Sequence, residues 1–281
     1  MTSDSSSRRQ ISGTIKTADP AKWNAADYAA NSVVQQTWAR ELMARLKLRG
    51  NEHVLDIGCG DGKVTAEIAN AVPNGSVVGI DASEEMIGFA RKTFPAKKVP
   101  NLEFHVMDAR RIRFGSRFDL AFSNAALHWV DDHQAILRGV TAALKPGARM
   151  IVSCGGKGNA QDVFVAVRPE MRMKRWRGFF RRMPKPYFFY SPDEYKKWLP
   201  RFGFKRLDIR LVPKDALYSG RDGFAAWLRT TWLPYVQRVP DDLREGFIAA
   251  VADRYLAKHP PDAQDKVHVR MVRLEIDAEK T

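Results

Sequence analysis

The stretch VLDIGCGDGK, residues Val54 to Lys63, decides the fold of this chain. It begins with a short apolar run, which is typical of a buried strand, and Asp56 lies at the end of that run. Glycines follow at positions 58, 60 and 62, where they allow a tight turn and let a ligand approach the backbone closely. The stretch therefore predicts a strand, a glycine turn and a helix, with a ligand site at the turn.

The same pattern of short strand and helix continues along the chain. Strands that alternate with helices predict an α/β fold, here a doubly wound, Rossmann-like and mostly parallel sheet. No helical crossover comes after the last strand, so we expect it to join the sheet antiparallel. We expect seven strands, at residues 52–57, 75–81, 101–109, 118–124, 147–154, 203–212 and 266–278.

Composition excludes several classes of protein. No apolar run approaches the roughly 18 residues of a membrane span. The two cysteines form neither a disulfide framework nor a zinc site, so we predict no metal and a reducing, cytoplasmic setting. The formal net charge of +14 is uneven, with +3 in residues 1–145 and +11 in residues 146–281. The second half would attract an anionic ligand, or it is simply a solvated basic surface; the oligomeric state stays open.

The N-terminal residues 1–20 read as a disordered tail, and residues 21–281 as one domain. Within that domain we expect two segments, about 155–200 and 214–258, to cover the site as a helical lid. From Arg168 to Arg182, seven of fifteen residues are basic and aromatic residues are interleaved. The favoured interpretation is an amphipathic lid helix with its cations outward. Nucleic acid and an anionic membrane surface are the alternatives.

The carboxylates around the glycine turn favour a cationic ligand. A pyrophosphate at this turn would meet the negative charges of Asp56 and Asp61, whereas S-adenosylmethionine carries an ammonium and a sulfonium and no phosphate. Asp81 ends the predicted second strand, where a carboxylate accepts hydrogen bonds from ribose hydroxyls. Asp108 ends the predicted third strand, where it would accept the adenine amino proton. Each Asp alone is also explained as a helix N-cap or turn residue.

At this point the sequence resembles the class I S-adenosylmethionine-dependent methyltransferases. The matching motifs, all within residues 52–153, are VLDIGCGDGKVT, VVGIDASEEMIGFAR, HVMDARRI, FDLAFSNAALHWV and LKPGARM. A narrower resemblance covers nearly the whole chain and involves a group of small-acid O-methyltransferases that includes trans-aconitate, juvenile hormone acid and malonyl-carrier-protein methyltransferases. It rests on YAANSVVQQTWA, on FSNAALHWV and on the closing helix and strand.

The resemblance implies S-adenosylmethionine as the cofactor and methyl transfer to a carboxylate of a small, anionic molecule. The cofactor positions that it implies, together with neighbours in the same motifs, are Tyr28, Asn31, Asp56, Gly58, Cys59, Gly60, Asp61, Asp81, Ala82, Met86, Asp108, Ala109 and Asn124. The candidates for holding the acceptor are Gln35, Gln36, His128 and Trp129.

A carboxylate acceptor is already a nucleophile at neutral pH and requires no general base. The amides of Gln35 and Gln36 and the indole of Trp129 would hold its oxygens by hydrogen bonds. A hydroxyl, carbon or nitrogen acceptor would gain from a base, and His128 is the candidate, although a structural role for His128 is the simpler interpretation. A nucleic-acid acceptor is less favoured, because SNAALHW stands where an NPPY-type motif would follow the fourth strand. A binding protein without turnover is the non-enzyme alternative.

Overall fold

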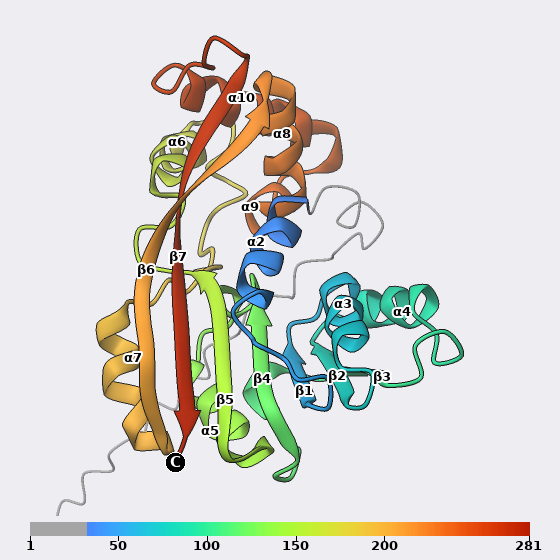
Figure 1. Ribbon diagram of the computed structural model, residues 1–281. Coiled ribbons are helices and arrows are strands. Elements are labelled where there is room, and N and C mark those ends of the chain that lie inside the picture. Colours follow the sequence, from blue (N-terminus) through green and yellow to red (C-terminus); the bar gives the residue numbers. More distant parts are fainter. Residues whose placement is uncertain (1–32) are drawn as a thin grey trace, which may run out of the picture.

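A computed structural model gives the arrangement of the chain, and it describes residues 33–281, with side chains from Thr37 onward. Over these residues the strands form a seven-stranded sheet in the order β3-β2-β1-β4-β5-β7-β6 (Figure 1). The strands are β1 (His53–Ile57), β2 (Ser76–Asp81), β3 (Leu102–Val106), β4 (Phe118–Asn124), β5 (Leu144–Gly155), β6 (Phe204–Ser219) and β7 (Lys266–Lys280).

The first five strands pair in parallel, whereas β7 lies antiparallel to both β5 and β6. The expectation of a doubly wound sheet with an antiparallel last strand is therefore confirmed. The order reverses between β1 and β4, since β2 and β3 extend to one side and the remaining strands to the other. In sheets of this kind, ligands bind at such a reversal, beyond the carboxyl ends of the strands.

Helices cover both faces of the sheet because its strands are apolar on both sides. In β1, Val54 joins the core under one set of helices and Leu55 the core under the other. The first face carries α2 (Val33–Met43), α3 (Lys63–Ala71) and α4 (Glu84–Thr93). The second face carries α5 (His133–Ala143), α7 (Pro192–Trp198) and the 3-10 helix η3 (Leu199–Phe202).

A third core lies beyond the sheet proper, where β6 and β7 continue as a long two-stranded ribbon (Figure 1). Around the far part of that ribbon pack α6 (Gln161–Arg172), α8 (Gly220–Thr231), α9 (Leu233–Val236) and α10 (Asp241–Leu256). We call this third core, with its helices, the helical lobe. It contains most of the two segments that the sequence assigns to a lid; the lid role itself stays a prediction.

Three boundaries differ from the expectation. Residues 214–219 belong to β6 rather than to the second lid segment, because they pair with the first half of β7. Helix α7, inside the first lid segment, packs on the sheet face instead. The predicted basic helix ends at Arg172, and residues 174–182 form successive turns. In these turns Trp176 and Phe180 face inward and are buried against Phe247 of α10.

Candidate functional site

The glycine turn occupies the carboxyl end of β1, beside the segment that leaves β4. Gly58, Gly60 and Gly62 all have positive φ values, of 77°, 53° and 80°. A Cβ on Gly58 would lie 2.1 Å from the Cβ of Ala126, so the turn passes directly against the chain that follows β4. The conformation therefore requires glycine, and it places this backbone at the point where the strand order reverses.

Two buried carboxylates flank the turn. Asp56 is 2% exposed and accepts a hydrogen bond of 2.7 Å from the Thr65 hydroxyl. Burial, with a smaller effect of the Asp81 charge, raises the pKa of Asp56 to about 7. Asp61 accepts the Lys63 amide N–H through Oδ1, while its buried Oδ2 has no hydrogen-bond partner among the described residues and lies 3.4 Å from Lys63 Nζ. A positively charged ligand near Asp56 would offset both the cost of its burial and its repulsion by Asp81.

Asp81 is the last residue of β2, and its hydrogen bonds stabilise the glycine turn that follows the neighbouring strand β1. Its carboxylate accepts the amide N–H of Gly60 at 3.1 Å and that of Ser83 at 2.9 Å. Burial raises its pKa above the ordinary value despite these bonds. Each oxygen keeps a further lone pair, so the group can accept ligand hydroxyls while it holds the turn.

The remaining predicted residues near the turn, Cys59, Ala82 and Met86, differ in how exposed their side chains are. The Cys59 side chain is buried beside Gly79 and Phe104, so only its backbone remains for a ligand. Burial, followed by the charges of the surrounding carboxylates, raises the pKa of Cys59 well above its usual range, which makes it an inert thiol. Ala82 is exposed directly after β2, whereas Met86 is buried in the first turn of α4.

The structure differs from the expectation at Asp108. Strand β3 ends at Val106, so Asp108 lies two residues beyond it and caps the 3-10 helix η1 (Ala109–Arg111). Both carboxylate oxygens accept from the Arg110 guanidinium, at 2.6–3.1 Å, and Arg110 also contacts Asp131 at 2.9 Å. Asp108 is an N-cap residue because its Oδ1 accepts the Arg110 backbone N–H at 2.8 Å, and its predicted role towards the adenine stays a prediction. Ala109 is half-buried next to it.

Asn124 and His128 lie at the carboxyl end of β4, across the turn from Asp81. Asn124 is the last residue of that strand, and His128 lies in the 3-10 helix η2 (Leu127–Trp129). His128 Nδ1 is 3.3 Å from the Gly155 amide nitrogen, whose N–H it accepts. Burial, with the Arg273 charge adding to it, lowers the pKa of His128 to about 3. The ring is therefore neutral, with its proton on Nε2, and it is a donor at that atom.

Aromatic rings surround His128 on the side of the helical lobe. The ring of Trp129 lies 5.7 Å from it, that of Tyr187 6.3 Å and that of Phe189 6.0 Å, centroid to centroid. The amide of Phe188 donates to the His128 carbonyl at 2.8 Å, so this aromatic segment is tied to η2 by its backbone. The predicted acceptor residues His128 and Trp129 are thus together, in apolar surroundings.

Arg273 is a residue of this region that sequence reasoning missed. It lies on β7, pairs with Gly155 of β5 and is only 4% exposed. Its guanidinium donates to the Ser153 hydroxyl at 3.1 Å, to the Ser153 carbonyl at 2.6 Å and to Asn124 Oδ1 at 3.2 Å. The guanidinium carbon lies 5.3 Å from the centre of the Trp38 ring. The available signal was an arginine on the face of β7 that Val267, Val269 and Met271 otherwise make apolar.

The side chains of four predicted residues lie outside the described part of the chain. Tyr28 and Asn31 lie outside the described residues. Gln35 and Gln36 belong to α2 by their backbone, and their side chains are also outside the described part of the chain.

Two general findings apply to residues 33–281. Their His, Cys, Asp and Glu side chains form no group of three or more suited to a metal ion. No helix in this range is long and apolar enough to cross a bilayer.

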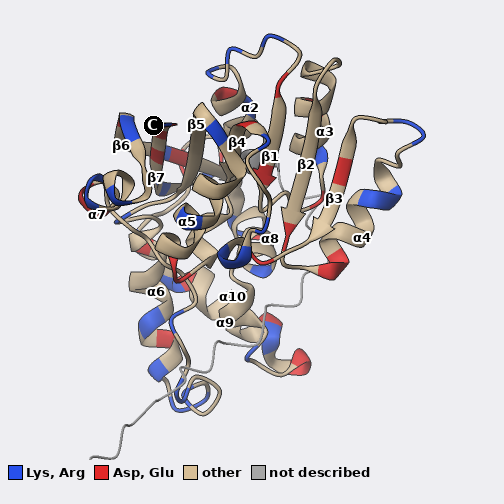
Figure 2. Ribbon diagram, turned by 90° about the horizontal axis from the view of Figure 1, so that it is seen from below, with Lys and Arg blue, Asp and Glu red and all other residues tan. Residues whose placement is uncertain are grey.

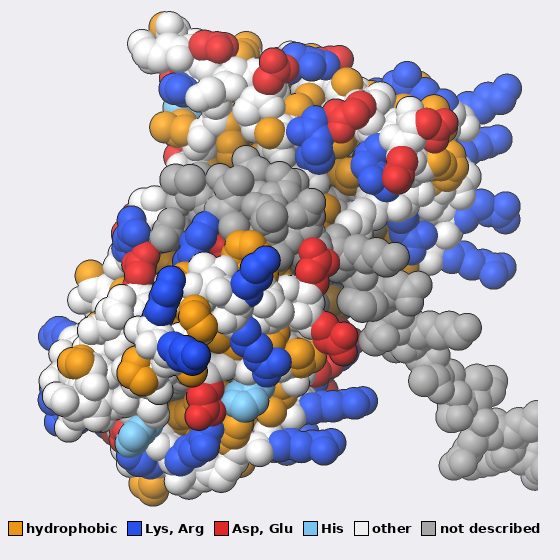
Figure 3. Space-filling model, turned by 90° about the vertical axis from the view of Figure 1, so that its right-hand side faces the viewer, with side chains coloured by type: hydrophobic (Ala, Val, Ile, Leu, Met, Phe, Trp, Pro, Cys, Tyr) orange, Lys and Arg blue, Asp and Glu red, His pale blue; other side chains and the backbone are white. Residues whose placement is uncertain are grey.

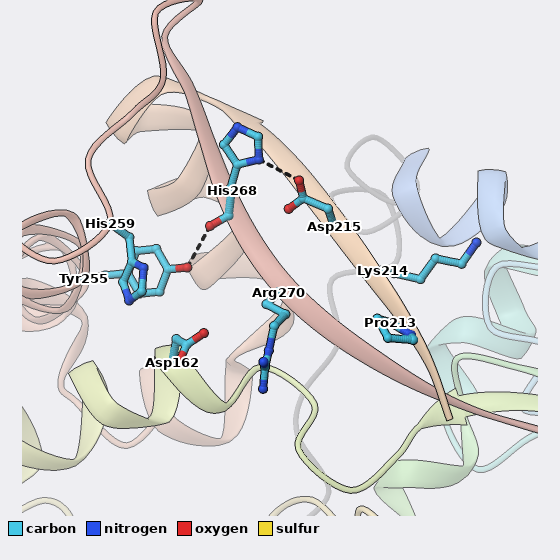
Figure 4. Close-up of a pocket in the computed structure, with 8 residues that line it drawn as sticks. All are labelled: Asp162, Pro213, Lys214, Asp215, Tyr255, His259, His268 and Arg270. Atoms are coloured by element: carbon cyan, nitrogen blue, oxygen red, sulfur yellow. Dashed lines mark hydrogen bonds and ion pairs between the residues drawn. The ribbon is translucent and has the colours of Figure 1, made fainter. Parts of the chain in front are cut away.

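A separate pocket of about 480 Å³ lies along the β6–β7 ribbon (Figure 4). His268 contacts Asp215 at 2.6 Å there, and the Tyr255 hydroxyl donates to the His268 carbonyl at 2.8 Å. The lining residues are Asp162, Pro213, Lys214, Asp215, Tyr255, His259, His268 and Arg270. None of them belongs to β1, β2 or β4, so this pocket is distinct from the candidate site.

Comparison with known proteins gives consistent results. A family model described as a methyltransferase domain matches residues 54–147. An uncharacterized methyltransferase of Schizosaccharomyces pombe is 33% identical over 202 residues, which cover 70% of this chain and 76% of that protein. A trans-aconitate 2-methyltransferase of Variovorax paradoxus is 28% identical, over 92% of this chain and 98% of its own.

Among solved structures, the chain is similar to phosphoethanolamine N-methyltransferase 2 of Haemonchus contortus in complex with S-adenosyl-L-methionine. The TM-score is 0.59 at 17% identity, and the match covers 91% of this chain and 56% of that one. At that identity, the likeness concerns the fold.

Proposed function

The chain belongs to the class I S-adenosylmethionine-dependent methyltransferases, and from this premise we propose that it methylates a carboxylate oxygen of a small organic acid. It is an enzyme, and its cofactor is S-adenosylmethionine. The proposal concerns the acceptor and the residues that serve it. The observation that carries it is the hydrogen bond from the Gly155 N–H to Nδ1 of His128, which leaves Nε2 of the neutral ring as a donor.

The residues at the glycine turn fit this cofactor. The buried Asp61 Oδ2 lacks a hydrogen-bond partner in the part of the chain that the structure describes, and Asp56 is a buried carboxylate with a raised pKa. A cation would stabilise both carboxylates. S-adenosylmethionine carries two positive charges, on its ammonium and its sulfonium, whereas a dinucleotide would place its negatively charged pyrophosphate at the turn. We propose that Asp56 and Asp61 face the amino-acid end and that Asp81 accepts the ribose hydroxyls, with Gly58 and Gly60 giving close backbone approach. Bound there, the cofactor supplies an electrophilic methyl group.

His128 does not have the properties of a general base. Nδ1 already accepts the Gly155 N–H, and Nε2 carries the proton of the neutral ring. With its pKa lowered to about 3, the ring also gains a proton only with difficulty. An acceptor that must lose a proton would find no help from it. A carboxylate needs none, and the Nε2–H and the Trp129 indole N–H would serve as donors to its oxygens.

Arg273 adds an electrostatic reason for an anionic acceptor. Its guanidinium is buried at the ends of β4 and β5, in register with the Gly155 backbone that binds His128. A positive charge in such surroundings is screened far less than one at the surface. It favours an anion near His128 and disfavours a second cation there.

Similarity to curated relatives supports the same acceptor. The trans-aconitate 2-methyltransferases match over 92% of this chain in Variovorax paradoxus, and their name specifies an acid. At 28% identity we infer for this chain only that the acceptor is an acid, and we leave the particular acid open.

We also expect the cytoplasmic setting predicted from the sequence, which suits the two buried free thiols of Cys59 and Cys154.

The chemistry that these residues would perform is positioning and exclusion of water. A carboxylate oxygen attacks the methyl carbon in line as the carbon–sulfur bond breaks, and the bonding electrons leave with a neutral sulfide. His128 and Trp129 would align the acceptor oxygens, and the rings of Tyr187 and Phe189 would exclude water that competes for the methyl group. No proton is transferred in this step.

The test uses S-adenosylmethionine labelled in its methyl group and a panel of mono-, di- and tricarboxylic acids. We expect label in a product that mild alkali releases as methanol, as a methyl ester requires. Label that survives alkali would instead identify an ether, N- or C-methyl product and refute the carboxylate proposal. Matched methyl esters and amides of the active acids serve as controls and should accept no label.

A further inference from the structure

The loop that follows α6 concentrates positive charge without compensation. Between Glu170 and Asp193 the sequence contains no acidic residue, while residues 172–185 include seven lysines and arginines. Arg175 pairs with the buried Glu170 at 3.4 Å. The other six form no ion pair with any residue of the described part of the chain, and all are exposed: Arg172, Lys174, Arg177, Arg181, Arg182 and Lys185. We call residues 172–185 the cationic loop.

The cationic loop is held in a fixed shape. Trp176 is 4% exposed and Phe180 is 8% exposed, and their rings lie 5.5 Å and 5.2 Å from that of Phe247 in α10. These aromatic anchors face inward, so the cations face outward from the helical lobe. Figure 2 shows Lys and Arg gathered on α6 and on the loop after it. In Figure 3, Lys and Arg side chains project from the upper right-hand edge of the molecule.

The cations of this loop repel one another, and an anionic partner would offset that repulsion. Six like charges on one loop repel one another, and none is neutralised within the described chain. Nucleic acid is the poorer candidate, because two of the three aromatic rings that would stack on bases, Trp176 and Phe180, are buried against Phe247, and the third, Phe179, is half-buried against the same core. A lipid surface needs no stacking, and it would accept an apolar side chain among the cations. Met173, within the loop, is 45% exposed.

We propose that the cationic loop docks the enzyme on an anionic lipid surface, with its arginines and lysines on the phosphate groups and Met173 against the lipid interface. The loop leads within a few residues to Tyr187 and Phe189, which lie next to His128. Docking would therefore bring the aromatic surroundings of the site close to the lipid. The proposal does not depend on which acceptor is methylated.

The test is co-sedimentation of the full chain with vesicles of phosphatidylcholine alone or of an equimolar mixture with phosphatidylglycerol. We expect binding to the mixed vesicles only, weakened by added salt. Replacing Lys174, Arg177 and Arg181 by Glu should weaken it at least about tenfold, since each cation near the surface contributes. The matched control replaces Lys92, Lys97 and Lys98 by Glu, which changes the net charge equally at exposed positions on and after α4; it should bind within about twofold of the wild type.

Thermal unfolding and S-adenosylmethionine affinity show whether each variant is folded, and a triple Gln variant of the same loop positions replaces the Glu variant if that one unfolds. The proposal is overturned by equal binding to both vesicle types, by no binding, or by equal losses in the loop and control variants. It is also overturned if the wild type binds duplex or single-stranded DNA and leaves the vesicles unbound.

Discussion

At the scale of single residues, the protonation states around the glycine turn decide how the cofactor binds. Asp56 has a pKa raised to about 7 by burial, so part of the unliganded protein carries a proton there at neutral pH. A cationic ligand favours the ionised carboxylate, and binding then releases that proton. The raised pKa also means that the unliganded fold loses stability as pH rises from the unfolded-state value of 3.8 towards about 7.

We therefore predict that the affinity for S-adenosylmethionine rises as pH increases from about 6 to about 8. Asp56→Asn should remove most of this dependence and weaken binding at the upper end. Isothermal calorimetry in two buffers with different ionisation enthalpies measures both the affinity and the proton release. An affinity that is constant across this range in the wild type would contradict the assigned role of Asp56.

His128 should behave as a donor that does not titrate in the working range. With a pKa near 3, it gives no step in the pH profile of kcat between about pH 5 and pH 8 at saturating cofactor. His128→Ala should lower kcat by about 10- to 100-fold, as expected for one lost hydrogen bond to a charged group. His128→Gln, which keeps an N–H donor, should recover part of this. A profile with a basic limb that vanishes in His128→Ala would indicate a general base instead.

At the scale of elements, the turn between β1 and α3 is fixed by sterics. Gly58 and Gly147 share a positive φ, of 77° and 75°, but a Cβ on Gly58 would meet Ala126 at 2.1 Å whereas one on Gly147 would meet nothing within 4 Å. We predict that Gly147→Ala costs about 1 kcal/mol of unfolding free energy, from backbone conformation alone. Gly58→Ala should cost clearly more and weaken cofactor binding. Equal denaturation midpoints for the two variants would contradict the close approach of the turn to Ala126.

Strand β7 contributes the buried charge, and its contribution can be isolated. Arg273→Gln should raise KM for the acid at least about tenfold, since a buried charge pair is worth more than a neutral hydrogen bond. The same change should let the pKa of His128 rise, which NMR titration of that ring detects. Affinity for S-adenosylmethionine reports whether the variant is folded. An unchanged KM for the acid would remove Arg273 from acceptor recognition.

The elements also show where sequence reasoning succeeds and where it stops. Short apolar runs identify the central strands β1, β2 and β4 because these are largely buried, and glycine spacing identifies the turn because its positive φ values favour glycine. The role of Asp108 towards the ligand stays a prediction, and its contact with Arg110 could not be predicted because the position of that guanidinium depends on the fold. Arg273 was missed for a related reason, since its neighbours Asn124 and Ser153 are more than 100 residues away along the chain.

At the scale of the whole molecule, the chain combines a sheet with two helical faces and a helical lobe on the extended β6–β7 ribbon (Figure 1). The carboxylates of the glycine turn lie on the first half of the sheet, and the cationic loop lies on the lobe. The +3 and +11 charges of the two halves of the chain reflect this division. One part thus presents negative charge to a cationic cofactor, while the other presents positive charge to anionic partners.

The central claim is that the anionic glycine turn at the reversal of the strand order selects a cationic nucleoside, and calorimetric titration of the wild type and Asp61→Asn tests it most directly. The matched control is Glu103→Gln, which removes one exposed charge from β3. We predict that the wild type binds S-adenosylmethionine and ignores NAD, and that Asp61→Asn binds S-adenosylmethionine at least about tenfold more weakly while the control is unchanged. Equal affinities in all three proteins, or tight binding of NAD by the wild type, would contradict the account.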